Sequence, residues 1–164
     1  MSCLGKLFLS VLMMYALENK ILSERQLGFL AENRTSDAHI IINNMIRKYS
    51  HKGGRKIYAC FVDFSKAFDT VPRDILLGKL RGRGITGHFF NIIKNIYSDD
   101  SACMKVGSRL TKPFDINMGV RQGCVLSPLL FNIFLADLAR ELESLPDQLR
   151  VREWILVQFS GLMT

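Results

Sequence analysis

Apolar positions recur at helical spacing in five stretches of the chain. Near the start, positions 4, 7, 8, 11, 12 and 15 follow the i, i+3, i+4 pattern of one helix. Two later stretches begin at good helix starts, the capping segment Thr35-Ser36-Asp37 and the pair Ser127-Pro128. The helices predicted in this way cover residues 4–15, 38–49, 73–80, 89–97 and 127–142.

Between the helical stretches lie segments with the character of strands. Residues 57–62 form a short apolar run rich in aromatic and β-branched side chains, which predicts a buried strand. Residues 102–106 and 113–117 predict a hairpin with Gly107-Ser108 near its turn. The expected fold class is α/β (α+β), a small antiparallel sheet centred on residues 57–62 with helices packed on one face.

Charge is distributed unevenly along the 164 residues. The formal net charge is +7, and residues 113–164 contain four basic and six acidic side chains, so the basic excess lies entirely upstream. A polyanionic partner such as nucleic acid is therefore worth considering. The four cysteines form no C-x-x-C pair and the three histidines have no metal-ligand spacing, which argues against a zinc site or a disulfide framework.

The apolar run at residues 7–16 has two interpretations. It has the length of a signal-peptide core, but its helical periodicity and the lack of an A-x-A-like cleavage site favour a helix of the folded domain. No apolar run approaches the ~20 residues needed to cross a bilayer. We therefore expect an intracellular protein, cytoplasmic or nuclear, that is not secreted and has no membrane partner.

A carboxylate directly follows the predicted strand, and a second lies six residues further on. Asp63 stands at the end of the strand, where an unpartnered charge is costly, and Asp69 follows a tight turn. Coordination of Mg²⁺ would stabilise such a carboxylate, because this ion takes oxygen ligands and completes its shell with water and substrate phosphates. A helix-capping role is the ordinary alternative. The spacing alone leaves both open.

A second group of polar side chains precedes the last predicted helix. Arg121, Gln122 and Gly123 present a guanidinium, an amide and a flexible backbone beside a helix N-terminus, which favours anions such as phosphate. An ordinary connecting loop explains the same residues equally well.

Taken together, the two segments resemble one family closely. Residues 61–71, F-V-D-F-S-K-A-F-D-T-V, followed by residues 119–132, G-V-R-Q-G-C-V-L-S-P-L-L-F-N, are similar to the reverse transcriptases of non-LTR (LINE-type) retrotransposons. Residues 26–29 with 33–37 resemble the fingers motif of that family, and residues 3–8 resemble a segment before it. The resemblance covers residues 3–145.

The resemblance implies roles for individual residues. The family's residue at the position of Asp63 binds the catalytic Mg²⁺ pair, and the residue at the position of Phe68 is an aromatic ring close to the sugar 2′ position. Asp69 has no expected role as a ligand. The residues expected to contact the incoming nucleotide are Arg34, Phe64, Phe68, Arg121, Gln122 and Gly123.

The reaction implied is RNA-directed DNA polymerisation by a two-metal mechanism, with deoxynucleoside triphosphates as substrates and an RNA template with a DNA primer, or an RNA–DNA hybrid, as partner. The fold implied is the fingers and partial palm of the polymerase, without a thumb. The oligomeric state is left open.

The family's second metal-binding element, an aromatic-x-Asp-Asp sequence after the helix that begins at Ser127-Pro128, is not found in that position. Tyr97-Ser98-Asp99-Asp100 has the right letters in the wrong place, and we interpret it as a solvated turn between a helix and a strand. Residues 1–145 are thus expected to be a partial reverse transcriptase domain and 146–164 a divergent or truncated tail. The two-ion site is expected to be incomplete in this chain alone, which makes the chain by itself inactive. The alternative is a degenerate, non-catalytic remnant that retains nucleic-acid binding.

Overall fold

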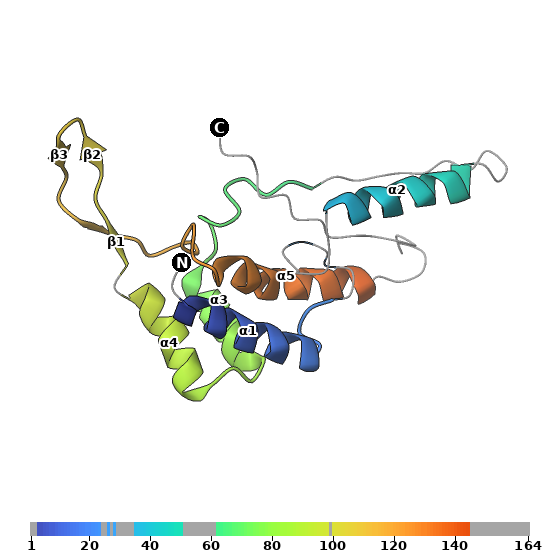
Figure 1. The fold of residues 1–164 in the computed structure, drawn as a ribbon, viewed down its shortest axis with the longest axis horizontal. Coiled ribbons are helices and arrows are strands. Elements are labelled where there is room, and N and C mark those ends of the chain that lie inside the picture. Colours follow the sequence, from blue (N-terminus) through green and yellow to red (C-terminus); the bar gives the residue numbers. More distant parts are fainter. Residues whose placement is uncertain are drawn as a thin grey trace. The chain divides into compact units, whose positions relative to one another are not determined.

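The computed structural model describes residues 3–23, 26, 28, 35–50, 62–98 and 100–144. All five predicted helices are present in this part of the chain (Figure 1). Their bounds are α1 Cys3–Glu18, α2 Thr35–Ser50, α3 Arg73–Gly82, α4 Gly87–Ser98 and α5 Ser127–Ser144. Most bounds lie within three residues of the prediction, because the periodicity of apolar positions and the capping residues define helix ends locally.

The predicted hairpin is also present, as two short antiparallel ladders. Strand β1 (Ser101–Ala102) pairs with β4 (Phe114–Asp115), and β2 (Lys105–Val106) pairs with β3 (Arg109–Leu110) across the turn at Gly107-Ser108. A bond from the Thr111 N–H to the Met104 carbonyl (2.9 Å) links the two ladders. Helices with a small antiparallel sheet make the described part of the chain α+β.

The predicted central strand is not seen in the described residues. Positions 57–61 lie outside them, and Val62 has no regular secondary structure and is 74% exposed. The prediction that Val62 is the buried end of a strand is therefore wrong. The rest of that strand, and the tail at 146–164, lie outside the described residues.

The chain forms two compact units. The first contains residues 1–15 and 66–134, and the second contains residues 16–65 and 135–164. In the first unit, α3 and α4 bury one face each, and Lys79 of α3 donates to the Phe134 carbonyl of α5 (2.7 Å). Its buried apolar side chains are Leu12, Val71, Leu76, Leu80, Ile85, Phe90, Ile93, Tyr97, Val120, Leu126, Leu129, Leu130, Phe131 and Ile133.

The second unit has a smaller core among the described residues. Ala16, Ile21, Ala38, Leu135, Ala136 and Ala139 are its buried apolar side chains. Ser23 donates to the Glu143 carboxylate (2.7 Å), so the segment after α1 is bonded to the end of α5. Arg140 adds longer bonds to the carbonyls of Lys20 and Ile21.

Helix α1 differs from the expectation of a core helix. Leu12 is buried and Phe8 lies against Phe89 with ring centroids 5.4 Å apart, so one face packs as predicted. Five large apolar side chains elsewhere on the helix are about half or more exposed, namely Leu4, Leu7, Val11, Met14 and Leu17, together with the polar Lys6 and Ser10. A core helix would bury such apolar side chains, so α1 is covered on one side only.

Candidate functional site

Two segments that are about fifty residues apart in the sequence lie side by side in the first unit. The Gly119 N–H donates to the Val71 carbonyl and the Val120 N–H donates to the Phe68 carbonyl, each at 2.8 Å. Pro72 and Met118 form an isolated antiparallel bridge beside them. The second half of the 61–71 motif and the start of the 119–132 motif are thus joined by their backbones.

Gly119 makes this close approach possible. Its φ is +88°, in the left-handed region, and a Cβ at this position would stand 2.8 Å from the Asp69 carbonyl oxygen and 2.9 Å from the Asp69 Cα. Both are backbone atoms, which cannot rotate away as the end of a side chain could. Only glycine meets both requirements without strain.

Side chains of the two segments make further contacts. Gln122 donates through its side-chain amide to the Asp69 carboxylate (2.8 Å), and both side chains are exposed. Phe68 is half-buried, with its ring centroid 5.1 Å from that of Phe131 in α5. Asp69, for which the resemblance implies no role as a ligand, is thus the hydrogen-bond partner of Gln122.

Arg73 makes more contacts than its predicted place at the start of a helix indicates. It is buried, and its guanidinium donates to the carbonyls of Gly119 (2.8 Å), Tyr97 (3.1 Å) and Ile116. It also forms an ion pair with Asp100 at 2.6 Å. One side chain therefore joins α3, the end of α4, the end of the hairpin and the 119–123 loop.

Asp100 is placed between two arginines. Its Oδ2 atom pairs with Arg73, and its Oδ1 atom accepts bonds from Arg121 Nε (3.0 Å) and Arg121 Nη2 (2.7 Å). The Asp100 side chain is only 9% exposed. Burial by itself would raise the pKa of Asp100, but the hydrogen bonds from Arg121 and Arg73 hold this pKa below its ordinary value. The interpretation of Asp100 as part of a solvated turn is wrong, because both of its oxygens are bonded to guanidinium groups.

The bond to Asp100 also changes the pKa of Arg121. Its side chain is 44% exposed, and the hydrogen bond to Asp100 raises the pKa of its guanidinium. Ser127 donates to the Arg121 carbonyl (2.7 Å), which ties the loop to the first turn of α5. Two guanidiniums share one carboxylate, so the three side chains of Arg73, Asp100 and Arg121 carry a net charge of +1 and still attract anions.

The remaining predicted site residues are less constrained. Asp63 and Phe64 are both exposed and belong to the second unit, whereas Phe68, Arg121, Gln122 and Gly123 belong to the first. Arg34 lies outside the described residues. The first unit therefore brings together four of the predicted side chains, all on the two joined segments.

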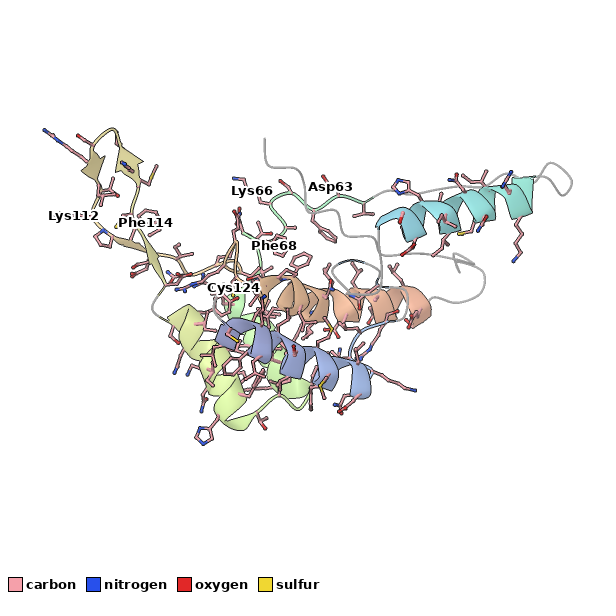
Figure 2. All side chains as sticks on the ribbon, in the orientation of Figure 1. Asp63, Lys66, Phe68, Lys112, Phe114 and Cys124 are labelled. Carbon is pink, nitrogen blue, oxygen red and sulfur yellow. The ribbon has the colours of Figure 1, made fainter. Side chains whose placement is uncertain are left out.

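The carboxylate of Asp63 suits a hard cation such as Mg²⁺, which one or two carboxylates hold together with water and phosphate oxygens. Figure 2 shows Asp63 and Lys66 on the irregular segment that leads to Phe68. Within the ranges that the structure describes, no three His, Cys, Asp or Glu side chains gather in a group able to hold a metal ion.

Membrane insertion finds no support in the helices. Of those in the described ranges, none combines the length and the apolar character that a bilayer span requires.

Comparison with known proteins connects these segments to one family. The family model described as reverse transcriptase (RNA-dependent DNA polymerase) matches residues 1–159. It therefore includes both joined segments, Asp63 and the segment of Arg34.

Individual relatives agree with this match. The chain is 33% identical over 120 residues to the retrovirus-related Pol polyprotein of the type-2 retrotransposable element R2DM of Drosophila melanogaster, covering 73% of this chain and 11% of the relative. It is 35% identical over 105 residues to the Pol polyprotein of the type-1 element R2 of Popillia japonica, covering 64% and 17%. It is 32% identical over 120 residues to the RNA-directed DNA polymerase of the mobile element jockey of Drosophila funebris, covering 71% and 12%. The matched part is less than a fifth of each of these relatives.

Proposed function

This chain belongs to the reverse transcriptase family, of the type found in non-LTR (LINE-type) retrotransposons, and we propose that it forms the fingers and part of the palm of an RNA-directed DNA polymerase. The observation that carries the proposal is the docking of residues 118–122 on residues 68–72. This contact places Phe68 and Gln122, both expected nucleotide contacts, on adjoining backbone segments.

The proposed reaction is templated transfer of a deoxynucleotide to a primer 3′ hydroxyl. Members of the family use Mg²⁺, and Asp63 is the residue of this chain that would hold it. Bound Mg²⁺ would stabilise the charge that develops on the attacking and leaving oxygens of an in-line displacement. The task of the protein side chains is to position the nucleotide and neutralise its phosphates.

Four residues of the first unit are proposed to contact the nucleotide. The Phe68 ring, held against Phe131, would limit the space at the sugar. Gln122, oriented by Asp69, and the adjacent Gly123 would contact the base and sugar. Arg121 would supply positive charge toward the phosphates, because the cluster it shares with Asp100 and Arg73 keeps a net charge of +1. Phe64 and Arg34 are proposed to complete the site.

The proposed partners are an RNA template and a DNA primer, bound mainly through phosphate contacts that are independent of sequence. We also propose that these 164 residues alone do not extend a primer at a useful rate. Asp63 is one carboxylate, and two ions about 4 Å apart need more protein ligands than one. A loss of several kcal/mol in transition-state stabilisation slows a reaction a thousandfold or more.

The test is primer extension on an RNA template with Mg²⁺ or Mn²⁺, alongside binding of the RNA–DNA hybrid. We expect binding with little or no extension. Adding the missing part of a related polymerase in trans, or extending the chain with it, is expected to give extension that Asp63→Ala abolishes.

The matched control is Glu141→Ala, a carboxylate exposed on α5, which is expected to leave extension unchanged. Robust extension by the 164 residues alone would overturn the inactivity proposal. Binding without extension in the completed protein would favour the alternative of a non-catalytic remnant, and absence of binding would overturn both.

A further inference from the structure

The hairpin arm, defined as residues 101–115, extends away from the helices of its unit (Figure 1). All of its side chains except Ala102 are exposed. Four of them are large and apolar with exposed fractions of 48–71%, namely Met104, Val106, Leu110 and Phe114. An isolated two-stranded ribbon with so much apolar surface in water is marginal, which indicates that something covers it.

The charges of the hairpin arm indicate what that partner is. Lys105, Arg109 and Lys112 are basic, and Asp115 at the base of the arm is its one acidic side chain, so the arm carries a formal net charge of +2. Strand register distributes the cations over both faces of the ribbon, since Lys105 pairs with Leu110 and Val106 pairs with Arg109. Each face therefore presents a cation beside an aliphatic side chain. A nucleic-acid strand suits such a surface, because its phosphates attract the cations and its sugars and bases can contact the apolar side chains.

The base of the hairpin arm is bonded to the proposed nucleotide site. The Ile116 N–H donates to the Asp100 carbonyl (2.8 Å), and the Ile116 carbonyl accepts from Arg73, which also holds the Gly119 carbonyl. Figure 2 shows Lys112 and Phe114 on the arm, apart from the helices. The arm is thus pre-oriented relative to the 119–123 loop, which lowers the entropy cost of binding.

We propose that the hairpin arm binds the sugar–phosphate backbone of single-stranded or hybrid nucleic acid, with Lys105, Arg109 and Lys112 at phosphates and Phe114 against a base or sugar. This assignment rests on the proposed function, because it names the surface that holds the polymerase's template or primer. A protein surface is the competing occupant, but the excess of three basic side chains over one acidic side chain in the arm gives a polyanion the better match.

The first experiment measures the dissociation constant for an RNA–DNA hybrid across a salt series. The variant is Lys105→Gln/Lys112→Gln, and the matched control is Lys6→Gln/Lys94→Gln, which removes two exposed lysines from α1 and α4. Loss of two phosphate contacts is expected to reduce the slope of log K against log salt by about 1.4 to 1.8. We expect affinity to fall about tenfold at physiological salt, with a smaller effect in the control.

The second variant tests the apolar part of the surface. Phe114→Ala is expected to weaken binding about fivefold or more while leaving the salt slope unchanged, because stacking releases no counterions. Ile92→Ala, which shortens an exposed apolar side chain on α4, is the matched control. Urea unfolding midpoints of all variants should stay near that of the unchanged protein, since the substituted side chains are exposed.

The outcomes separate the two proposals. If the unchanged protein binds the hybrid and the arm variants bind equally well with the same slope, the arm proposal is overturned and the proposed function stands. If the unchanged protein fails to bind, the proposed function is overturned too. Equal losses in the arm variant and the lysine control would show only general electrostatic attraction and would also overturn the arm assignment.

Discussion

The buried Arg73 side chain joins four segments of the first unit. Its donors reach three backbone carbonyls and one carboxylate, from partners 24 to 46 residues away in the sequence. A lysine has one compact charge and could not span these acceptors in the planar geometry of a guanidinium. Unpaired buried carbonyls would then carry a desolvation cost of about 1–3 kcal/mol each.

The carboxylate bonded to Arg73 predicts a specific pH dependence. The pKa of Asp100 is lowered in the folded protein, so its contribution to stability is fully present above the unfolded value of about 3.9. That contribution is lost as the pH falls through the lower, folded pKa. Asp100→Asn is expected to reduce the free energy of unfolding by roughly 3 kcal/mol near pH 6.

Urea unfolding between pH 6 and pH 2.5 measures this effect. The difference between the unchanged protein and Asp100→Asn should shrink toward acid pH, because protonation removes the charge that the substitution removes. Asp115→Asn, at an exposed position, should change stability by no more than ~0.5 kcal/mol throughout. A difference that stays constant down to pH 2.5 would contradict the assigned role of Asp100.

Gly119 provides a second test at the residue scale. Gly119→Ala adds left-handed strain and a collision with the Asp69 backbone, so we expect a loss of more than about 3 kcal/mol in unfolding free energy. Gly107→Ala is the matched control, because Gly107 also has a positive φ (+61°) but open space around its Cβ position. It should cost only about 1 kcal/mol.

Equal losses in the two alanine variants would show that backbone strain alone matters at Gly119. The close approach to Asp69 would then have no energetic importance.

These residue-scale contacts mark the limit of what the sequence predicts. The motif letters and their resemblance identified Phe68 and Gln122, and the structure joins their segments. The contacts of Arg73, Asp69 and Asp100 were not predicted, because their partners lie at least 21 residues away in the sequence. A local sequence pattern does not indicate contacts over such distances. In the sequence itself Arg73 is only an arginine directly after Pro72, which a helix start explains.

Helices were the most predictable elements of the molecule. Apolar spacing predicts α2, α4 and α5 with ends within three residues of the observed ones, because it acts over a few residues of sequence. Periodicity also identified α1 as a helix, but it could not tell which of two apolar faces is covered. The prediction that Val62 is buried was wrong for a related reason: an apolar run shows that a segment could be buried, but not that it is.

Helix α3 allows a test of propensity at the element scale. Gly78 lies inside this helix, is exposed, and has no atom within 4 Å of its Cβ position. Gly78→Ala should therefore stabilise the protein by about 0.5–1 kcal/mol, through the better helix propensity of alanine. Thermal or urea unfolding measures the gain, and a loss of stability would show that the helix needs glycine at this position for a contact.

At the scale of the whole molecule, the basic excess and most of the exposed large apolar side chains of the described residues lie in the same part of the chain, residues 1–112. The hairpin arm holds three of the cations, with Asp115 as its one carboxylate. The most extensive exposed apolar stripe of a single described helix lies on α1. The matched stretch spans 11% and 12% of the length of two of the relatives, which are much longer proteins.

The exposed face of α1 has a consequence for how the purified protein behaves. Association through Leu4, Leu7 and Val11 would be driven by release of water, so it should strengthen on warming and with sulfate or phosphate salts. Nucleic-acid binding through the hairpin arm should weaken under the same salts, because counterion release becomes less favourable. Adding such a salt to the protein–nucleic acid complex would therefore release the nucleic acid and promote self-association of the protein, whereas cold buffers of moderate ionic strength would keep the protein dispersed.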